Sequence, residues 1–257
     1  MTVGSFFLGF ATTSETIHRA SGGRKWEASD PKFAGHSTIR IATKDQPAHL
    51  LLYKPEHESV LPYLVAYQCE FALRTILADP SSQFNLVSKP SMQREVLELM
   101  QRHHQGKDDI PSHVVPQLAN QFGNALGFQL RSMPITMRID KLIHDAHPEL
   151  KELQHESIDR QLQENMGALS PRSKVIAPNE IIRPNASMNA AFAKFFAGLW
   201  NAPMIFAPYV AAGYGDAASA LLAFHEQIPA ESNRDRELVD AWAKYTGLDR
   251  WFETKGR

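Results

Sequence analysis

The stretch from Leu61 to Ala78 constrains the fold of this 257-residue chain more than any other, because apolar residues occupy almost every side of it. Pro62 suits the first turn of a helix, where its missing N–H would have no partner. The segment Ala78-Asp79-Pro80-Ser81-Ser82 then ends the pattern. A helix that is apolar on nearly every side is a buried one, so we expect a central helix over residues 61–78.

Two short strands are predicted before this helix, at Thr38–Ala42 and His49–Tyr53. The residues between them, Lys44-Asp45-Gln46-Pro47, favour a turn, so the two strands are expected to form a hairpin. The apolar N-terminal residues 1–11 are expected to form a buried strand or a short helix at the edge of the core.

Helical patterns dominate the rest of the chain. Amphipathic spacing predicts helices at Gln93–His103, Pro148–Met166 and Asp235–Tyr245, the last ending at Gly247. Two more helices are expected to begin at side-chain caps, one at Asn185 or Ser187 and one at Asp216. We therefore predict a single α+β domain over residues 1–257. It should be predominantly helical, with a strand-rich part over about 1–56, a helical part over about 57–257 and a small N-terminal sheet or hairpin.

Composition argues against several classes of function. The 27 basic and 28 acidic residues leave a net charge of −1, so no basic excess drives phosphate binding and no nucleic-acid partner is expected. The N-terminal apolar run is far shorter than the roughly 20 residues of a membrane span and lacks the basic start of a secretory signal. Cys69 has no second cysteine to pair with. We expect a cytoplasmic protein without membrane contact, in which Cys69 is a small buried hydrophobe rather than a nucleophile.

Several short motifs begin like functional sites without completing them. His57-Glu58 and His155-Glu156 start like the zinc motif His-Glu-x-x-His, but Leu61 and Asp159 stand where the second histidine is needed. His144 and His147 are spaced to share a metal ion, although histidines at a helix end also interact favourably with the helix dipole. A loose basic stretch fits an anion site or a solvated loop equally well, at Arg172, Lys174 and Arg183.

Residues 37–78 carry a resemblance to a known family. A strand, His49-Leu-Leu-Leu-Tyr53, leads into Leu61-Pro-Tyr-Leu-Val-Ala-Tyr-Gln-Cys-Glu-Phe-Ala-Leu-Arg74. This stretch resembles the core of the ImmA/IrrE group of zinc metallopeptidases, in which a strand precedes a helix that begins like Leu-Ile-Ala-His-Glu-x-x-His-x-Leu-Arg. The resemblance implies a zincin-like core.

The residues that carry the family's chemistry are replaced. Tyr67 and Phe71 stand at the positions of the two zinc histidines, and Gln68 stands at the position of the general base. Zinc needs lone-pair ligands that a phenyl ring does not offer, and an amide does not accept the proton of a zinc-bound water. Glu70 lies within the motif but off the face shared by Tyr67 and Phe71. The family's further acidic ligand corresponds to Glu95 or Glu98, which the resemblance leaves unaligned. We therefore expect no zinc hydrolysis, no metal and no cofactor at this helix.

The first functional hypothesis is a non-catalytic binding or regulatory protein on this degenerate frame. Its former cleft would hold a partner's peptide or a small ligand, lined by Tyr67, Gln68 and the loop around Tyr209 and Tyr214. A protein or peptide partner is therefore expected.

Two alternatives stay open. An enzyme can assemble its site from residues far apart in sequence, and the candidates are His144, His147, Glu152 and Asp216. A structural subunit of a larger assembly would use aromatic anchors, and the C-terminal half is rich in them: Phe195, Trp200, Tyr209, Trp242, Tyr245 and Trp251. Helical patterns place most of these aromatic residues in a core instead.

Overall fold

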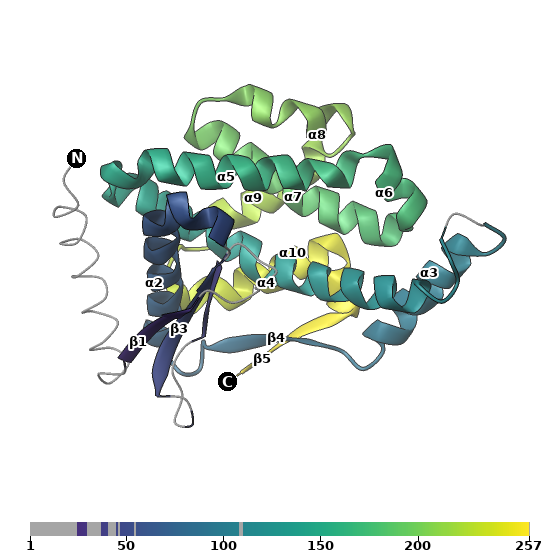
Figure 1. Cartoon of the computed structure of the whole chain (residues 1–257), viewed down its shortest axis with the longest axis horizontal. Coiled ribbons are helices and arrows are strands. Elements are labelled where there is room, and N and C mark those ends of the chain that lie inside the picture. Colours follow the sequence, from purple (N-terminus) through teal and green to yellow (C-terminus); the bar gives the residue numbers. More distant parts are fainter. Residues whose placement is uncertain are drawn as a thin grey trace. The chain divides into compact units, whose positions relative to one another are not determined.

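The computed structural model describes residues 25–29, 37–40, 45, 47–53, 55–107 and 110–256. The predicted fold class is confirmed, because helices predominate and two small sheets accompany them (Figure 1). The chain divides into two compact units. The first unit comprises Met1–Asp79 with Arg138–Arg160, and the second comprises Pro80–Met137 with Gln161–Arg257. The segment expected over residues 1–11 lies outside the described residues.

The sheet of the first unit contains the predicted hairpin and one further strand. Strand β2 (Ser37–Arg40) runs antiparallel to β3 (Ala48–Tyr53), which confirms the hairpin. Strand β1 (Lys25–Ser29) pairs with the other edge of β3 in parallel, so the order is β1-β3-β2. Strand β1 was not predicted, because its residues, Lys-Trp-Glu-Ala-Ser, include none of the β-branched residues typical of strands.

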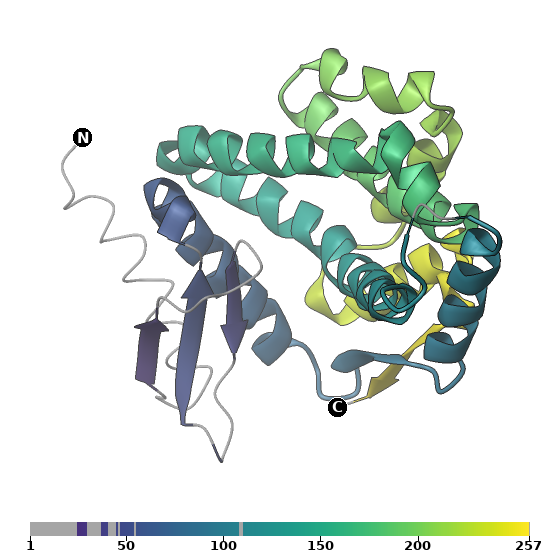
Figure 2. The same cartoon turned by 45° about the vertical axis from the view of Figure 1, so that its right-hand side comes forward.

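Helix α2 (Leu61–Leu77) follows this sheet directly, after the short 3₁₀ helix η1 (Pro55–Val60). Cys69 and Ala72 of α2 are buried with Ile39 of β2, and partly buried apolar side chains surround them. Figure 2 shows α2 beside the three-stranded sheet. The predicted helix is confirmed, but the prediction that it is buried on every side is wrong. Only one face meets the sheet, and Leu77 at the end of the helix is 60% exposed.

Helices α4 (Val115–Ala146) and α5 (Lys151–Asn165) are joined by the short η2 (Pro148–Leu150) and are shared between the units. The end of α4 and most of α5 complete the first unit, whereas the start of α4 belongs to the second. The prediction of α5 is confirmed. Helix α4 was not predicted, because it contains residues that usually interrupt helices, namely Gly123, Gly127 and Pro134.

The core of the second unit forms around α7 (Asn179–Leu199), α9 (Gly215–Gln227) and α10 (Asp235–Thr246). Phe192, Phe196 and Trp242 are fully buried, and Trp242 Nε1 donates to the Leu221 carbonyl oxygen at 3.1 Å. The remaining helices are α3 (Met92–His104), α6 (Pro171–Ile176), α8 (Ala207–Ala211) and the 3₁₀ turns η3 (Met166–Leu169), η4 (Pro203–Ile205), η5 (Ser232–Arg234) and η6 (Leu248–Arg250).

A two-stranded sheet of the second unit brings the end of the chain back to α3 and α4. Strand β5 (Phe252–Gly256) pairs antiparallel with β4 (Phe84–Ser88) (Figure 1). A Cβ at Gly127 of α4 would lie 2.6 Å from the Phe252 ring, so only glycine permits this close approach. The glycine that weakens the helical pattern in the sequence is therefore required by packing.

Two predicted helix starts are wrong and one predicted helix end is confirmed. Helix α7 already begins at Asn179, so Asn185 and Ser187 lie inside it rather than at its cap. The N-cap of α9 is Tyr214, and Asp216 lies in the first turn. Helix α10 ends at Gly247 as predicted, in the left-handed conformation with φ 71°. Over the described residues, no helix combines the length and the apolar character needed to cross a membrane.

Candidate functional site

The face of α2 that the sequence singled out is used for packing. Gln68 is 5% exposed, and its Nε2 donates to Ser37 Oγ at 2.9 Å, so the side chain ties α2 to β2. Tyr67 is half-buried, with its ring 6.3 Å from that of Tyr63. Phe71 packs on the buried cluster of Ile39, Cys69 and Ala72. Gln68 and Phe71 therefore hold the helix to its sheet.

Glu70 and Cys69 have raised pKa values for the same physical reason. Burial raises the pKa of Glu70, an effect that the nearby His147 and Arg74 oppose. Burial also raises the pKa of Cys69 to about 12, with the Glu70 charge adding to the effect. A thiol with such a pKa stays protonated at neutral pH and is a poor nucleophile.

The histidines suggested as metal ligands each contact a different side chain. His144 Nδ1 lies 3.3 Å from Gln154 Oε1, and His147 Nδ1 lies 3.2 Å from Glu149 Oε1. Within the part of the chain that the structure describes, no group of three or more His, Cys, Asp or Glu residues is arranged to hold a metal ion.

A buried polar network that the sequence analysis missed centres on Asp140 of α4. Tyr63 donates its hydroxyl to Asp140 Oδ1 at 2.6 Å, and Gln154 Nε2 donates to the Asp140 carbonyl oxygen at 2.8 Å. Burial raises the pKa of Asp140 to about 7, although the hydrogen bonds from Tyr63 and Gln154 favour the charged form. Burial together with the Asp140 charge also raises the pKa of Tyr63. The network is closed to substrate, because Asp140 and Gln154 are 0% exposed; we assign it a structural role.

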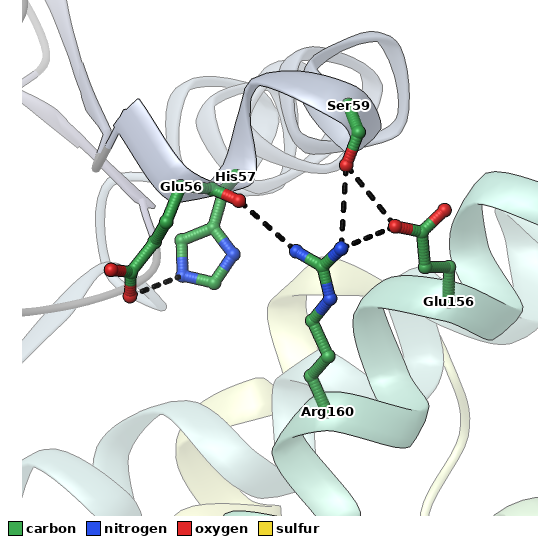
Figure 3. Close-up of polar contacts among 5 residues, drawn as sticks. All are labelled: Glu56, His57, Ser59, Glu156 and Arg160. Carbon is green, nitrogen blue, oxygen red and sulfur yellow. Dashed lines mark hydrogen bonds and ion pairs between the residues drawn. The ribbon is translucent and has the colours of Figure 1, made fainter.

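A group of polar contacts joins η1 to α5 and includes a residue of each incomplete His-Glu motif, His57 and Glu156 (Figure 3). Arg160 donates to the Glu56 carbonyl oxygen at 3.1 Å and also pairs with Glu156. Ser59 Oγ donates to Glu156 at 3.1 Å. His57 is buried, with Nε2 3.8 Å from Glu56 Oε1. Glu156 thus anchors η1, and the motif on α5 serves structure.

A pocket of about 320 Å³ lies within the second unit, between α4, the η3–α6 segment and the start of α7. Its lining is mainly apolar, from Phe122, Leu126, Ile176, Ile181, Ile182 and several alanines. The polar residues that line it are Gln129, Ser170, Arg172, Ser173 and Asn185. An apolar concave site with a few converging polar groups is the usual form of a small-molecule site.

Connected amides lie beside this pocket. Gln129 Nε2 donates to Asn189 Oδ1 at 2.6 Å and to the Asn185 carbonyl oxygen at 3.3 Å. Asn189 Nδ2 donates to Asn185 Oδ1 at 3.2 Å and to the Asn165 carbonyl oxygen at 3.3 Å. Of the pocket residues, only Arg172 was predicted as part of a possible binding site. Asn185 was noted as a cap, and no local motif signals this arrangement.

The remaining candidates lie elsewhere in the second unit. Glu95 accepts a hydrogen bond from Trp251 Nε1 at 3.0 Å, and Glu98 lines a larger hollow of about 960 Å³ between α3 and α4. That hollow is lined largely by exposed polar side chains and borders residues 108–109, which are not described. Tyr209 is 1% exposed, whereas Tyr214 is half-buried.

The residues of the two alternative hypotheses are distributed as follows. Glu152 is exposed on α5 in the first unit, and Asp216 is exposed on α9 in the second. Of the C-terminal aromatics, Tyr209, Trp242 and Trp251 are fully buried, and Tyr245 is 44% exposed.

No protein-family model, no curated protein and no solved structure matches this chain. The chemistry of its own residues is therefore the basis for assigning a function.

Proposed function

We propose that the chain is a non-catalytic binding protein and that the pocket of the second unit holds a small, largely apolar ligand. The observation that carries this proposal is the combination of an apolar lining with Gln129 and Asn185 at one site. Ligand sites of proteins usually have volumes of about 300–1,000 Å³, and this pocket of about 320 Å³ falls at the small end of that range.

The side chains around the pocket favour binding over catalysis. Those among the described residues supply amides, hydroxyls and the guanidinium of Arg172, but no carboxylate, thiol or imidazole. A serine hydroxyl becomes a nucleophile only with a general base beside it, and that base is normally a carboxylate or an imidazole. Recognition by shape and hydrogen bonds is the chemistry that these residues offer.

Obstructing the pocket tests this proposal. Ala125 lines the pocket from an exposed position on α4, so Ala125→Phe should fill it without entering the core. Gln121→Phe places the same ring on an exposed position of α4 that does not line the pocket, and it is the matched control. A set of bicyclic aromatic fragments, screened by ligand-observed NMR, should bind the native chain and Gln121→Phe but not Ala125→Phe. Equal binding to all three proteins, or to none, would refute the proposal.

We also propose that the first unit is a zinc-peptidase-like frame without its zinc chemistry, which binds a protein or peptide partner. Support for the frame comes from the order of the hairpin, η1 and α2. The packing of Gln68 and Phe71 agrees with the loss of zinc chemistry but counts against a cleft at these residues. A single buried cysteine fits the reducing cytoplasm as the compartment.

Restoring the replaced residues tests the frame. A Tyr67→His/Gln68→Glu/Phe71→His variant should take up zinc stoichiometrically, as measured by elemental mass spectrometry, while the native chain stays empty. A folded variant that binds no zinc would contradict the frame, and so would zinc in the native chain.

A further inference from the structure

The orientation of each amide beside the pocket follows from two backbone carbonyls. A backbone carbonyl oxygen only accepts, so the Gln129 side-chain atom facing the Asn185 carbonyl must be its nitrogen. For the same reason the Asn189 atom that faces the Asn165 carbonyl must be its nitrogen. Asn189 Oδ1 then accepts from Gln129, and Asn185 Oδ1 accepts from Asn189. A flip of Gln129 or Asn189 would set an oxygen against a carbonyl oxygen, and a flip of Asn185 would set its NH₂ group against the Asn189 NH₂ group.

Among the contacts of the described residues, two amide atoms stay available once these bonds are assigned. Both N–H groups of Gln129 are used, which leaves its Oε1 as an acceptor. Asn185 Oδ1 is used, which leaves its Nδ2 as a donor. Gln129 and Asn185 both line the pocket. The residues that line the pocket therefore carry one acceptor and one donor that no bond of the network uses.

Of the other polar residues at the pocket, Ser170 accepts from the Ser173 N–H at 3.2 Å through its Oγ. The Ser173 hydroxyl already donates to the Ser170 carbonyl oxygen at 2.7 Å. Arg172 is exposed, so solvent and salt screen its attraction for an anion. A ligand carboxylate would moreover place a charged acceptor opposite the acceptor Gln129 Oε1.

We propose that the pocket recognises a neutral amide head, a carboxamide or a lactam, on an apolar body. The head's carbonyl accepts from Asn185 Nδ2, and its N–H donates to Gln129 Oε1. This inference rests on the pocket being a ligand site, and it adds the chemical class of the ligand. A buried donor or acceptor left without its partner is costly, so a head lacking either group should be rejected.

Probes that share one apolar body and differ only in the head test the inference. Naphthalene carboxamide offers donor and acceptor, acetylnaphthalene offers the acceptor alone, and naphthoate offers charged acceptors. Dissociation constants from protein-observed NMR should be at least about tenfold lower for the carboxamide than for either other probe, the loss expected for one unmatched buried hydrogen bond.

Asn185→Asp should change this preference. The aspartate keeps an oxygen to accept from Asn189 but replaces the donor Nδ2 with a negatively charged acceptor. Naphthamidine, a cation that only donates, should bind Asn185→Asp at least about tenfold more tightly than the native chain, and the carboxamide should bind it more weakly. Asn120→Asp is the control, because Asn120 Oδ1 likewise accepts from another asparagine, Asn124, on an exposed face of α4 away from the pocket. Circular dichroism confirms that each variant is folded.

The possible outcomes separate this inference from the proposed function. Carboxamide preference in the native chain with a switch to amidine in Asn185→Asp supports the amide head. Similar binding of all probes overturns the amide head and leaves the pocket as an apolar site. Preferential binding of naphthoate also overturns it, and makes Arg172 the determinant. Absence of binding for every probe overturns the proposed function as well.

Discussion

The first unit is expected to lose stability as the pH rises from acidic to neutral values. Replacing Asp140 with asparagine is expected to remove most of that loss. Asparagine keeps an Oδ1 that can accept from Tyr63 and Gln154. It replaces Oδ2, which has no hydrogen-bond partner among the described residues. The substitution therefore removes the ionisable group while keeping the hydrogen bonds from Tyr63 and Gln154.

The magnitude follows from the pKa of Asp140, which burial raises from 3.8 to about 7. The folded protein binds the proton of the Asp140 carboxyl more tightly than the unfolded chain does. Protonation of Asp140 therefore stabilises the folded state fully below about pH 4, and this contribution is lost as the pH rises to about 7. One pKa unit corresponds to about 1.36 kcal/mol. Between about pH 4 and pH 8 the native chain should therefore lose about 4 kcal/mol that Asp140→Asn does not lose.

The assay is urea unfolding followed by circular dichroism, at several pH values for both proteins. The difference between their unfolding free energies should change by about 4 kcal/mol in favour of the variant as the pH rises from about 4 to about 8. Any fixed cost of burying the new amide N–H groups cancels in this comparison. Asp45→Asn, at an exposed position of the first unit, should follow the native profile. Parallel profiles for the native chain and Asp140→Asn would show that Asp140 is already ionised when buried.

Other predictions concern packing and reactivity. Gly127→Ala places a Cβ 2.6 Å from the Phe252 ring and should lower the unfolding free energy by about 1–3 kcal/mol. Gly198→Ala, at a helical glycine with open space, should raise it by about 0.5–1 kcal/mol in the same urea assay; equal effects would contradict the close approach. Tyr209→Phe removes a buried hydroxyl that has no hydrogen-bond partner among the described residues, and the variant should gain about 1 kcal/mol by thermal unfolding. A loss of stability would show that the hydroxyl is bonded. Burial raises the pKa of Cys69 to about 12, so its reaction with a thiol reagent should be slow at neutral pH and become fast in urea. Rapid labelling of the folded chain would contradict its burial.

Local patterns account for the parts of the fold that could be predicted. The hairpin and α2 follow from apolar runs separated by a turn, and α10 ends at Gly247 because glycine tolerates a positive φ. Helix α4 could not be predicted, since its Gly127 reflects packing against Phe252, a residue more than 100 positions later. Intrinsic propensity is overridden there by a contact that no local window contains.

The candidate pocket could not be predicted for the same reason. Gln129 and Asn189 are separated by 60 residues and Asn165 and Asn189 by 24, so their hydrogen bonds arise only once α4, the end of α5 and α7 are packed. A polar residue inside a helical pattern resembles a cap or a solvated position when its partner is unknown. Asn185 was assigned as a cap for that reason, although it takes part in the amide network.

The interleaving of the two units has a consequence for synthesis of the chain. Tyr63 and Asp140 are 77 residues apart, and the residues between 80 and 137 belong to the second unit. Translation proceeds at about 5–20 residues per second, so α2 emerges from the ribosome about 4–15 s before the segment that completes its unit. During that interval the apolar side chains of α2 are exposed, because residues 138–160 of the first unit have not yet been synthesised. During translation this protein should depend on a chaperone that covers exposed apolar segments. Slower codons before the end of the first unit at Arg160 should prolong the exposure of α2 much more than slower codons beyond Arg160.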